Sequence, residues 1–521
     1  MTTIPQLFAT AVERFGTHPA LIEPVDDAQV STLTYQELQE RVESFAGYLQ
    51  QQQIEKGERI MIWSASRANW LVAYFGALLV GMVVVPLDVN TREDFLGRIA
   101  ETTEAKWLVT TQKQYSGLKQ PAVALIPIDE LPQGPLDRTQ LPTVNEDDLA
   151  ELVFTSGTTG QPKGVMLSHR NIVSNATTAV EVVDIKEQDR ALSILPLSHM
   201  LEMTIEIALL YSGASIVYAR TLAPDTLLKL LSTQQVTCMI LVPQALLLFL
   251  NGIEREVRRQ RKMKQWEALH RFAANTPFGV RRYLFRDVHK RFGGHFRFFV
   301  SGGAYLPPAL AQRWEDMGFR VMQGYGATEC APVISATPYQ DHNLRSVGKP
   351  LPDVEVRIAQ DGEILVRGPN VAQGYWKNPE ATSAVFKDGW YHTGDLGYLD
   401  SANSLYLKGR KKNLIVLANG MNVYPEDIEN VLQRDSNLKD VIVIAVNEAE
   451  GGPQVHAVLL LDDPEKAKGI IQQANKQLAP HQQIKGFTVW PEKDFPRTHT
   501  LKVKRQEVQD QLLAKRGGKT K

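Results

Sequence analysis

Apolar strand-like runs alternate with helical patterns over most of this chain. The run Arg59–Trp63 is followed by a helical pattern over Trp70–Leu79, and Ala214–Tyr218 is followed by Pro224–Ser232 and then by Cys238–Val242. This alternation is typical of βαβ units, in which helices connect the strands of mainly parallel sheets. Because a chain of 521 residues exceeds what one hydrophobic core usually holds, we expect about two to four domains.

The pattern changes after Leu405–Lys412, a charged segment that contains one glycine. Beyond it the sequence predicts strands at Asp440–Val446, Val455–Leu461 and Phe487–Trp490, and a helix near Lys466–Leu478. The expected fold class is therefore α/β, with a large N-terminal domain of βαβ subdomains and mainly parallel sheets, and with a small α+β C-terminal domain.

Composition excludes several classes of protein. Lys and Arg number 57 against 58 Asp and Glu, so no general attraction to nucleic acid is expected. The two cysteines, Cys238 and Cys330, cannot build a disulfide framework or a zinc site, which favours a reducing, cytoplasmic location. The first residues lack a signal-peptide pattern. The apolar segment Trp70–Val85 is shorter than a membrane span of about 20 residues, so we expect a buried helix followed by a strand.

A segment rich in hydroxyl groups and glycines follows the apolar run Leu152–Phe154. Small residues let the backbone approach an anion, hydroxyls donate hydrogen bonds and a lysine adds a positive charge, so the segment is equipped to hold nucleotide phosphates. The usual phosphate-loop motif does not fit, because Pro162 stands where its second glycine would be. The candidate residues are Thr155, Ser156, Gly157, Thr158, Thr159, Gly160 and Lys163.

The order T-S-G-T-T-G-Q-P-K-G resembles the phosphate loop of the AMP-forming adenylate synthetases, the superfamily of acyl-CoA synthetases, luciferases and adenylation domains. Five further motifs follow in the order that this superfamily uses: Ser301–Ala304, Gly324–Glu329, Trp390–Asp395, Gly409–Lys412 and Pro496–Lys502. The resemblance covers nearly the whole chain. It implies ATP and Mg²⁺ as cofactors and CoA as a co-substrate.

The resemblance assigns roles in the N-terminal domain. Gly303 and Ala304 are expected to line the adenine, although a tight strand-to-helix turn is the alternative interpretation of their motif. Tyr325 offers a ring on which adenine can stack, Thr328 offers a hydroxyl to a phosphate, and Glu329 offers a carboxylate to Mg²⁺.

Other roles fall in the C-terminal part of the chain. The resemblance implies that Asp395 binds the ribose and that Arg410 contacts the nucleotide. Lys412 occupies the family's hinge position, and Gly420 belongs to a loop that enters the site for thioester formation. Lys502 would place its ammonium against the carboxylate and the α-phosphate.

These assignments define the expected domains. Residues 1–408 form the N-terminal adenylate-forming domain, residues 409–412 the hinge, and residues 413–521 a small mobile domain that carries the catalytic lysine. Glu329, Thr328 and Lys502 form the expected catalytic set.

Four residues are expected to border the acyl group: His199, Gly302, Gly324 and Gly326. Acetate-activating relatives have Trp where this chain has Gly326, so the missing side chain is expected to leave an acyl tunnel open. His199 is interpreted as lining the pocket and not as a general base. The segments Pro196–Glu202 and Arg297–Leu306 resemble those of bacterial long-chain fatty acyl-CoA synthetases.

A basic insertion, residues 254–291, contains five aromatic residues: Trp266, Phe272, Phe278, Tyr283 and Phe285. One interpretation is a pair of solvated helices. The other is a peripheral contact with anionic lipid at the inner face of the membrane, or with an acidic carrier protein.

The leading hypothesis is therefore an AMP-forming long-chain fatty acid:CoA ligase. An acyl:carrier-protein ligase, with the same adenylation step and a protein-bound thiol, is the nearest alternative. A luciferase-like oxygenase and a non-ribosomal adenylation module are further alternatives, and a non-enzymatic adenylate-binding scaffold would be expected to lack Lys502 or Glu329.

Overall fold

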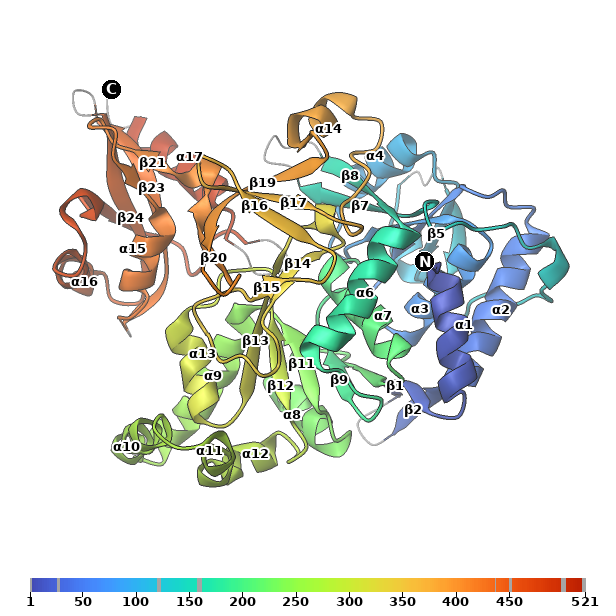
Figure 1. Cartoon of the computed structure of the whole chain (residues 1–521), viewed down its shortest axis with the longest axis horizontal. Coiled ribbons are helices and arrows are strands. Elements are labelled where there is room, and N and C mark those ends of the chain that lie inside the picture. Colours follow the sequence, from blue (N-terminus) through green and yellow to red (C-terminus); the bar gives the residue numbers. More distant parts are fainter. Residues whose placement is uncertain are drawn as a thin grey trace. The chain divides into compact units, whose positions relative to one another are not determined.

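The computed structural model describes residues 2–25, 29–119, 123–156, 162–435, 437–448, 452–497 and 503–517. The chain forms two compact units, each built from two stretches of sequence (Figure 1). The first unit comprises Met1–Val356 and Val366–Tyr391, and the second comprises Arg357–Leu365 and His392–Lys521.

The division between the units falls at residues 391–392, earlier than the segment 409–412 that the sequence suggests. The reason is that β20 (Leu405–Arg410) pairs antiparallel with β19 (Trp390–Leu399), which keeps both strands together. Residues 409–412 therefore lie inside the second unit, and a hinge at this place stays a prediction.

The larger sheet of the first unit has nine strands in the described part of the chain. In spatial order these are β15 (Lys349–Pro350), β14 (Val333–Ala336), β13 (Arg320–Gly326), β12 (Phe298–Ser301), β11 (Cys238–Leu241), β9 (Arg190–Ser193), β10 (Ser215–Tyr218), β1 (Pro19–Pro24) and β2 (Val30–Thr34). The strands from β13 to β1 run parallel, and β2, β14 and β15 join antiparallel at the edges.

A second sheet of the first unit has six strands among the described residues. Their order is β6 (Ala124–Pro127), β5 (Trp107–Thr110), β3 (Arg59–Trp63), β4 (Val83–Leu87), β7 (Leu149–Ser156) and β8 (Pro162–Ser168). All neighbours are parallel except β7 and β8, which form a hairpin. Two mainly parallel sheets with connecting helices confirm the α/β fold class.

Helices connect these strands and cover the sheets (Figure 1). They are α1 (Ile4–Phe15), α2 (Tyr35–Gln51), α3 (Ala68–Leu79), α4 (Glu93–Thr103), α5 (Gln112–Ser116), α6 (His169–Val183), α7 (Met200–Tyr211), α8 (Pro224–Thr233), α9 (Pro243–Arg259), α10 (Met263–Ala273), α11 (Phe278–Leu284), α12 (Arg286–Arg291), α13 (Pro308–Asp316) and α14 (Pro379–Val385).

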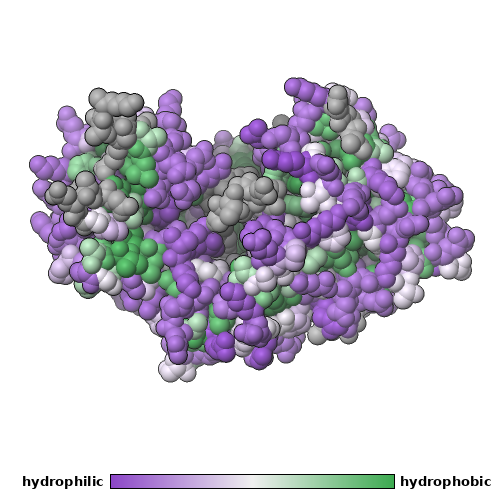
Figure 2. Space-filling view, turned by 90° about the horizontal axis from the view of Figure 1, so that it is seen from above, coloured by the Kyte–Doolittle hydropathy of each residue, from purple (hydrophilic) through white to green (hydrophobic). Residues whose placement is uncertain are grey.

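The apolar segment Trp70–Val85 folds as the sequence predicts, into the buried helix α3 followed by β4. Its neighbour α2 packs closely against it, because Gly76 leaves room for the Phe45 ring, which would lie 2.7 Å from a Cβ at that position. None of the described helices has the length and apolar character needed to cross a bilayer. The face of the molecule in Figure 2 is mostly hydrophilic, with small hydrophobic patches.

The second unit is built on shorter sheets. A five-stranded sheet contains β16 (Glu355–Ile358), β17 (Glu363–Arg367), β19, β18 (Phe386–Lys387) and β20. Of these strands, β20 lies wholly in the second unit and β18 in the first, and the chain passes from one unit to the other within β16, β17 and β19. The remaining elements are β21 (Ile415–Val416), β22 (Asn422–Val423), α15 (Pro425–Leu432), β23 (Leu438–Glu448), β24 (Gly452–Leu461), α16 (Ala467–Asn475), β25 (Gly486–Val489) and α17 (Arg505–Gly517).

Side chains that point alternately to the two faces of β23 form part of the hydrophobic core of the second unit. Val441 and Val443 pack in a cluster with residues of α15 and α16, whereas Ile442 and Ile444 pack in a separate cluster with residues of α17. Successive side chains of a strand point to opposite faces, so one apolar strand supplies both clusters. The predicted strands and helix of this α+β unit are confirmed, each shifted by at most a few residues.

Candidate functional site

The phosphate-loop segment begins and ends in the β7–β8 hairpin. Thr155 pairs with Lys163, and Ser156 pairs with Pro162, so the two strands bring the ends of the segment together. The predicted strand before the segment is confirmed, because Leu152–Phe154 lies within β7. Gly157, Thr158, Thr159 and Gly160 lie outside the described residues.

Lys163 and Glu329 are linked by a tyrosine that sequence reasoning missed. The Lys163 Nζ lies 5.1 Å from the centroid of the Tyr375 ring. The Tyr375 hydroxyl donates a hydrogen bond to Glu329 Oε1 at 2.8 Å. The predicted phosphate ligand and the predicted metal ligand thus face the same aromatic side chain, although they lie 166 positions apart in a chain of 521.

The segment that carries Tyr375 is fixed by main-chain hydrogen bonds on two sides. On the hairpin side, the Met166 amide donates to the Gly374 carbonyl at 3.0 Å and the Trp376 amide donates to the Gly164 carbonyl at 2.7 Å. On the other side, the Ala372 amide donates to the Glu329 carbonyl at 2.8 Å. The backbone therefore holds Tyr375 between the phosphate hairpin and the Glu329 turn.

Two buried asparagines support the turn that contains Thr328 and Glu329, the short helix Thr328–Cys330. The Asn370 amide donates to the carbonyls of Cys330 and Val333, both at 3.0 Å. Asn175 of α6 accepts from the Val333 amide at 3.1 Å and donates to its carbonyl at 2.7 Å. Single asparagines carry no sequence signal of such a role, so both were missed.

Three of the predicted acyl-pocket glycines lie at the ends of adjacent strands. Gly302 directly follows β12, and Gly324 lies in the paired strand β13, where its carbonyl would be 3.6 Å from a Cβ on Gly302. A Cβ on Gly302 would also lie 3.0 Å from Leu201 of α7. A Cβ on Gly324 would have the Ser335 carbonyl, at 4.0 Å, as its nearest neighbour.

Gly326 requires a correction. A Cβ at this position would lie 1.8 Å from the Pro332 carbonyl oxygen, so the space beside the glycine is filled by backbone and not by an open tunnel. The close approach is part of the turn itself, since the Ala327 amide donates to the same carbonyl at 2.9 Å. The sequence-based argument that a missing side chain leaves an acyl tunnel open here is therefore not supported.

The predicted acyl-pocket histidine and the predicted adenine-binding residues of the first unit lie in a helix cap, in a strand and at the surface. His199 is the N-cap of α7, and its Nδ1 accepts from the Leu201 amide at 3.2 Å. Tyr325 lies in β13 and its ring is buried. Gly303 has a φ of +77°, which suits a glycine, and Ala304 follows it on the surface.

Asp395 and Arg410 face each other in the second unit. They are register partners in the β19–β20 ladder, and the Arg410 Nε lies 2.8 Å from Asp395 Oδ1. The Asp395 amide donates to Thr393 Oγ1 at 3.0 Å, and Gly394 between them has a φ of +69°. The positive φ of Gly394 lies within the strand β19 and not in a separate turn.

The remaining predicted residues of the second unit lie at turns. Lys412 is exposed, and partial desolvation, followed by the nearby Arg410, lowers the pKa of its ammonium. Gly420 has a φ of +78° in the turn between β21 and β22, with no atom within 4 Å of a Cβ placed there. Lys502 lies outside the described residues.

The site suits a magnesium–nucleotide complex by its donor set. Among the described residues, no three His, Cys, Asp or Glu side chains come together as metal ligands. Glu329 thus offers one carboxylate, and Mg²⁺ typically takes one or two protein carboxylates together with substrate phosphates.

A buried pair of carboxyl groups lies in α7, directly after His199. Glu202 is 2% exposed and Glu206 is 1% exposed, and the Tyr218 hydroxyl donates to Glu206 Oε2 at 2.7 Å. Burial raises the pKa of both carboxyls, and the charge of Glu206 raises that of Glu202 further. The hydrogen bond from Tyr218 opposes the rise for Glu206. Sequence reasoning missed this pair because each glutamate lies in an otherwise ordinary helical pattern.

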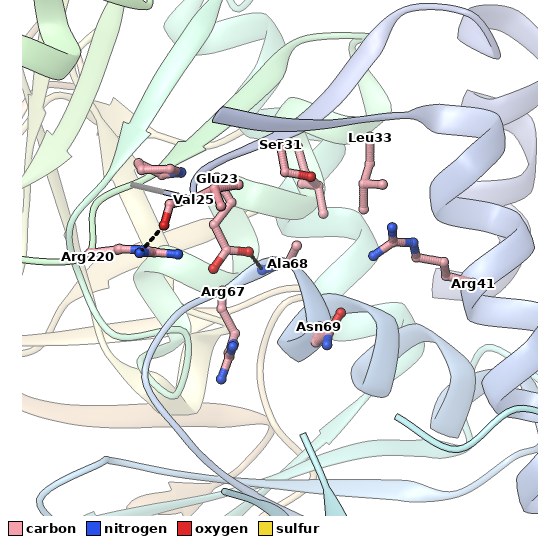
Figure 3. Close-up of a pocket in the computed structure, with 11 residues that line it drawn as sticks. Glu23, Val25, Ser31, Leu33, Arg41, Arg67, Ala68, Asn69 and Arg220 are labelled. Atoms are coloured by element: carbon pink, nitrogen blue, oxygen red, sulfur yellow. Dashed lines mark hydrogen bonds between the residues drawn. The ribbon is translucent and has the colours of Figure 1, made fainter. Parts of the chain in front are cut away.

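A separate cavity of about 230 Å³ opens in the first unit at the ends of β1 and β2 (Figure 3). Glu23 points into it and accepts from the Ala68 amide at 3.3 Å, which satisfies the N-terminus of α3. Arg220 donates to the Val25 carbonyl at 2.6 Å, and Arg67 pairs with Asp129 at 2.8 Å. None of the predicted site residues lines this cavity.

The basic insertion is helical, but it forms more than the expected pair of helices. It contains the end of α9 and the whole of α10, α11 and α12, which group together in Figure 1. Trp266 and Phe285 are buried and meet edge to face, with ring centroids 5.3 Å apart. Phe272 and Tyr283 are exposed, by 61% and 67%.

The sequence of this chain matches two family models and is similar to known ligases. A family model described as AMP-binding enzyme matches residues 8–376, and one described as AMP-binding enzyme C-terminal domain matches residues 412–514. A long-chain-fatty-acid–CoA ligase of Salmonella typhimurium is 28% identical over 580 aligned positions, which cover 98% of this chain and 95% of the relative.

Solved structures of similar fold include ATP-bound MatB from Rhodopseudomonas palustris, with a TM-score of 0.81 and 26% identity over 98% of this chain and 99% of that one. The o-succinylbenzoate CoA synthetase of Bacillus subtilis in complex with ATP and magnesium has a TM-score of 0.79 and 26% identity over 97% and 99% of the two chains.

Proposed function

This chain belongs to the AMP-binding enzyme family of AMP-forming acyl-adenylate synthetases, and we propose that it is an acid–thiol ligase that activates a fatty acid with ATP and transfers the acyl group to CoA. The single observation that carries the proposal is the link from Lys163 through Tyr375 to Glu329. It joins a phosphate ligand to a carboxylate suited to magnesium in a chain of this family.

The reaction has two steps. A carboxylate oxygen of the acid attacks the α-phosphorus of ATP, the bond to pyrophosphate breaks, and an acyl-adenylate forms. The sulfur of CoA then attacks the acyl carbon, the carbon–oxygen bond to AMP breaks, and the thiol proton is lost. Neither step needs a covalent intermediate on the protein, so positioning and charge stabilisation are its main contributions.

The residues divide between these tasks. Lys163, with the hydroxyl groups of Thr155 and Ser156, would hold the phosphates, and Glu329 would hold Mg²⁺, which offsets their negative charge when bound. Asp395, paired with Arg410 at 2.8 Å, would receive the ribose hydroxyls. Tyr325 and Thr328 would contact the adenine and a phosphate.

Further residues would act in adenylation, in the change between the two steps and around the substrates. Lys412 would be the pivot of a rotation between the steps, Gly420 would enter the site for thiol transfer, and Lys502 would act in adenylation. Gly303 and Ala304 would line the adenine. His199, Gly302 and Gly324 would border the acyl group.

A fatty acid as substrate is supported by the names of the relatives, among them the ligase from Salmonella typhimurium at 28% identity. The preference for a long chain is part of the proposal. It is supported by the space beside Gly324, where a Cβ would meet no atom closer than 4.0 Å.

Pyrophosphate release, measured over a series of saturated fatty acids with and without CoA, tests the proposal. We expect release to depend on the acid and on Mg²⁺, and acyl-CoA to accumulate only when CoA is present. Release that does not depend on any fatty acid would contradict the substrate class. The alternative acceptor, the thiol of an acyl carrier protein, would be favoured if acyl-CoA fails to form while acyl-carrier product does.

The basic insertion suggests that the enzyme takes up its fatty acid at a lipid surface. Exposed Phe272 and Tyr283 stand among basic helices, a combination that favours peripheral binding to anionic lipid. Co-sedimentation with anionic and with neutral vesicles tests this. We expect binding to the anionic vesicles alone, weakened by salt and by the double substitution F272S/Y283S. Equal recovery with both vesicle types would leave the interpretation as solvated helices.

A further inference from the structure

We propose that Tyr375 is a positioning residue for the metal-binding carboxylate: its hydroxyl fixes one oxygen of Glu329 so that the other is presented to Mg²⁺ on the nucleotide. The inference rests on the proposed function, and it concerns a residue that binds neither nucleotide nor metal in that proposal.

The hydrogen bond occupies one side of the carboxylate. Tyr375 donates to Glu329 Oε1 at 2.8 Å, and no hydrogen bond from another described residue reaches Oε2. A carboxylate held at one oxygen cannot rotate freely about its last bond, so its second oxygen keeps a defined direction. Residues that orient metal ligands in this way commonly set metal affinity.

The tyrosine is itself held in place. Its side chain is 6% exposed, its ring meets the Phe386 ring edge to face at 5.9 Å, and its amide donates to Thr382 Oγ1 at 2.9 Å. It also forms an antiparallel bridge with Val165 of β8. The phenol oxygen therefore has a fixed position that does not depend on any ligand.

A phenol suits this role by its charge. A phenol hydroxyl is a neutral donor, so it can hold one oxygen of Glu329 without adding a charge beside the carboxylate. A lysine or arginine at this place would neutralise the carboxylate that the metal needs. The positive charge in reach is instead Lys163, placed over the ring face where it can meet phosphate.

The experiment uses the substitution Tyr375→Phe, which keeps the ring, its packing and the contact with Lys163, and removes only the hydroxyl. Tyr35→Phe is the matched control: Tyr35 is buried like Tyr375, and its hydroxyl donates to the carbonyls of Leu210 and Ala214 at 3.1 and 2.7 Å, away from the site.

Two quantities are measured in the full-length protein: the free Mg²⁺ concentration that gives half-maximal pyrophosphate release, and the rise in melting temperature that Mg²⁺ produces in the presence of ATP. We expect Y375F to need about 10- to 100-fold more Mg²⁺ and to lose most of the magnesium-dependent rise in melting temperature. Y35F is expected to lower the melting temperature without changing either magnesium response.

A double-mutant cycle with Glu329→Gln completes the test. If Tyr375 acts through Glu329, adding Y375F to E329Q changes the magnesium responses no further. Magnesium responses of Y375F equal to those of Y35F, or full additivity with E329Q, would overturn the proposal. If Y375F does not fold, the variant Thr382→Val takes its place, because it removes the acceptor of the Tyr375 amide. We expect T382V to shift both magnesium responses in the same direction as Y375F, but to a smaller extent. Unchanged magnesium responses of T382V would count against the proposal.

The melting-temperature readout separates this inference from the proposed function. If no fatty acid supports pyrophosphate release, the proposed reaction fails, but the magnesium-dependent stabilisation by ATP still reports whether Tyr375 orients Glu329.

Discussion

Gly324 and Gly326 are two residues apart in β13, but their surroundings are opposite. A Cβ on Gly326 would collide with the Pro332 carbonyl at 1.8 Å, whereas a Cβ on Gly324 would meet its nearest neighbour at 4.0 Å. We expect G326A to lower the free energy of unfolding by about 1–3 kcal/mol, because the backbone must move to admit the methyl group. We expect G324A to change it by less than about 0.5 kcal/mol.

Denaturant unfolding of the two variants checks these values. The same pair tests the proposed acyl pocket, since a methyl group on Gly324 enters space that an acyl chain would use. The kcat/KM of G324A is expected to fall more for a long fatty acid than for a short one. A well-folded G326A variant with wild-type stability would show that the turn can relax in solution.

The Glu202–Glu206 pair predicts a dependence of stability on pH. Burial raises the pKa of Glu206 from its ordinary value of 4.5 to about 8 in the folded chain. Between these values the folded state binds more protons than the unfolded state, so stability falls as pH rises, by up to about 1.4 kcal/mol per pH unit for one group. The charged and polar groups that face the Glu206 carboxyl are those of Tyr218, Ser193 and Glu202.

Glu206→Gln keeps an acceptor for Tyr218 and removes the titration. We expect its melting temperature to fall less than that of the wild type as pH rises through this range. Glu151→Gln is the comparison, because Glu151 is likewise buried, accepts a hydrogen bond from Tyr74, and has a pKa raised only to about 7. The difference in melting temperature between E151Q and the wild type should therefore stop changing at a lower pH than the difference between E206Q and the wild type. Parallel curves for E206Q and wild type would show that Glu206 does not titrate in this window.

Among the elements, the β21–β22 turn allows a direct test of the thiol-transfer loop. Gly420 has a φ of +78°, a conformation that costs about 1–2 kcal/mol for a residue with a side chain, and there is open space around it. We expect G420A to slow acyl transfer to CoA while pyrophosphate release persists, because the strain changes the loop and not the nucleotide site. Single-turnover measurement of each step checks this.

Gly389 provides the matched control in another hairpin, β18–β19. Its φ is +77°, and a Cβ there likewise has no atom within 4 Å. G389A should carry a similar strain and leave thioester formation unchanged. Equal effects of G420A and G389A on acyl transfer would show that the Gly420 loop has no special part in the second step.

Sequence patterns located most elements, because strands and helices leave local signals. The run Arg59–Trp63 became β3 with the same bounds, and the alternation after Asp440 became β23 and β24. Contacts between distant segments left no such signal. The Tyr375–Glu329 hydrogen bond joins residues 46 positions apart, and the collision at Gly326 arises from the carbonyl of Pro332 beyond a turn. Gly326 was therefore interpreted from its missing side chain, without the backbone that fills the space.

For the whole molecule, the sequence motifs assign different steps to residues of the second unit. Lys502→Ala is expected to reduce adenylate formation by about 100-fold or more, because it removes the charge that would face the reacting carboxylate and phosphate. Thioester formation from pre-made acyl-adenylate should be retained. Equal loss in both half-reactions would contradict the role assigned to Lys502 in adenylation.

The chain passes between the two units at residues 356–357, 365–366 and 391–392. On the ribosome, the stretch Arg357–Leu365 of the second unit therefore emerges before the Tyr375 segment of the first, while β20 is not yet made. The first unit cannot close around Glu329 until the nascent chain has left it and come back. No single cut in the gene therefore yields two fragments that each carry one complete unit and nothing else.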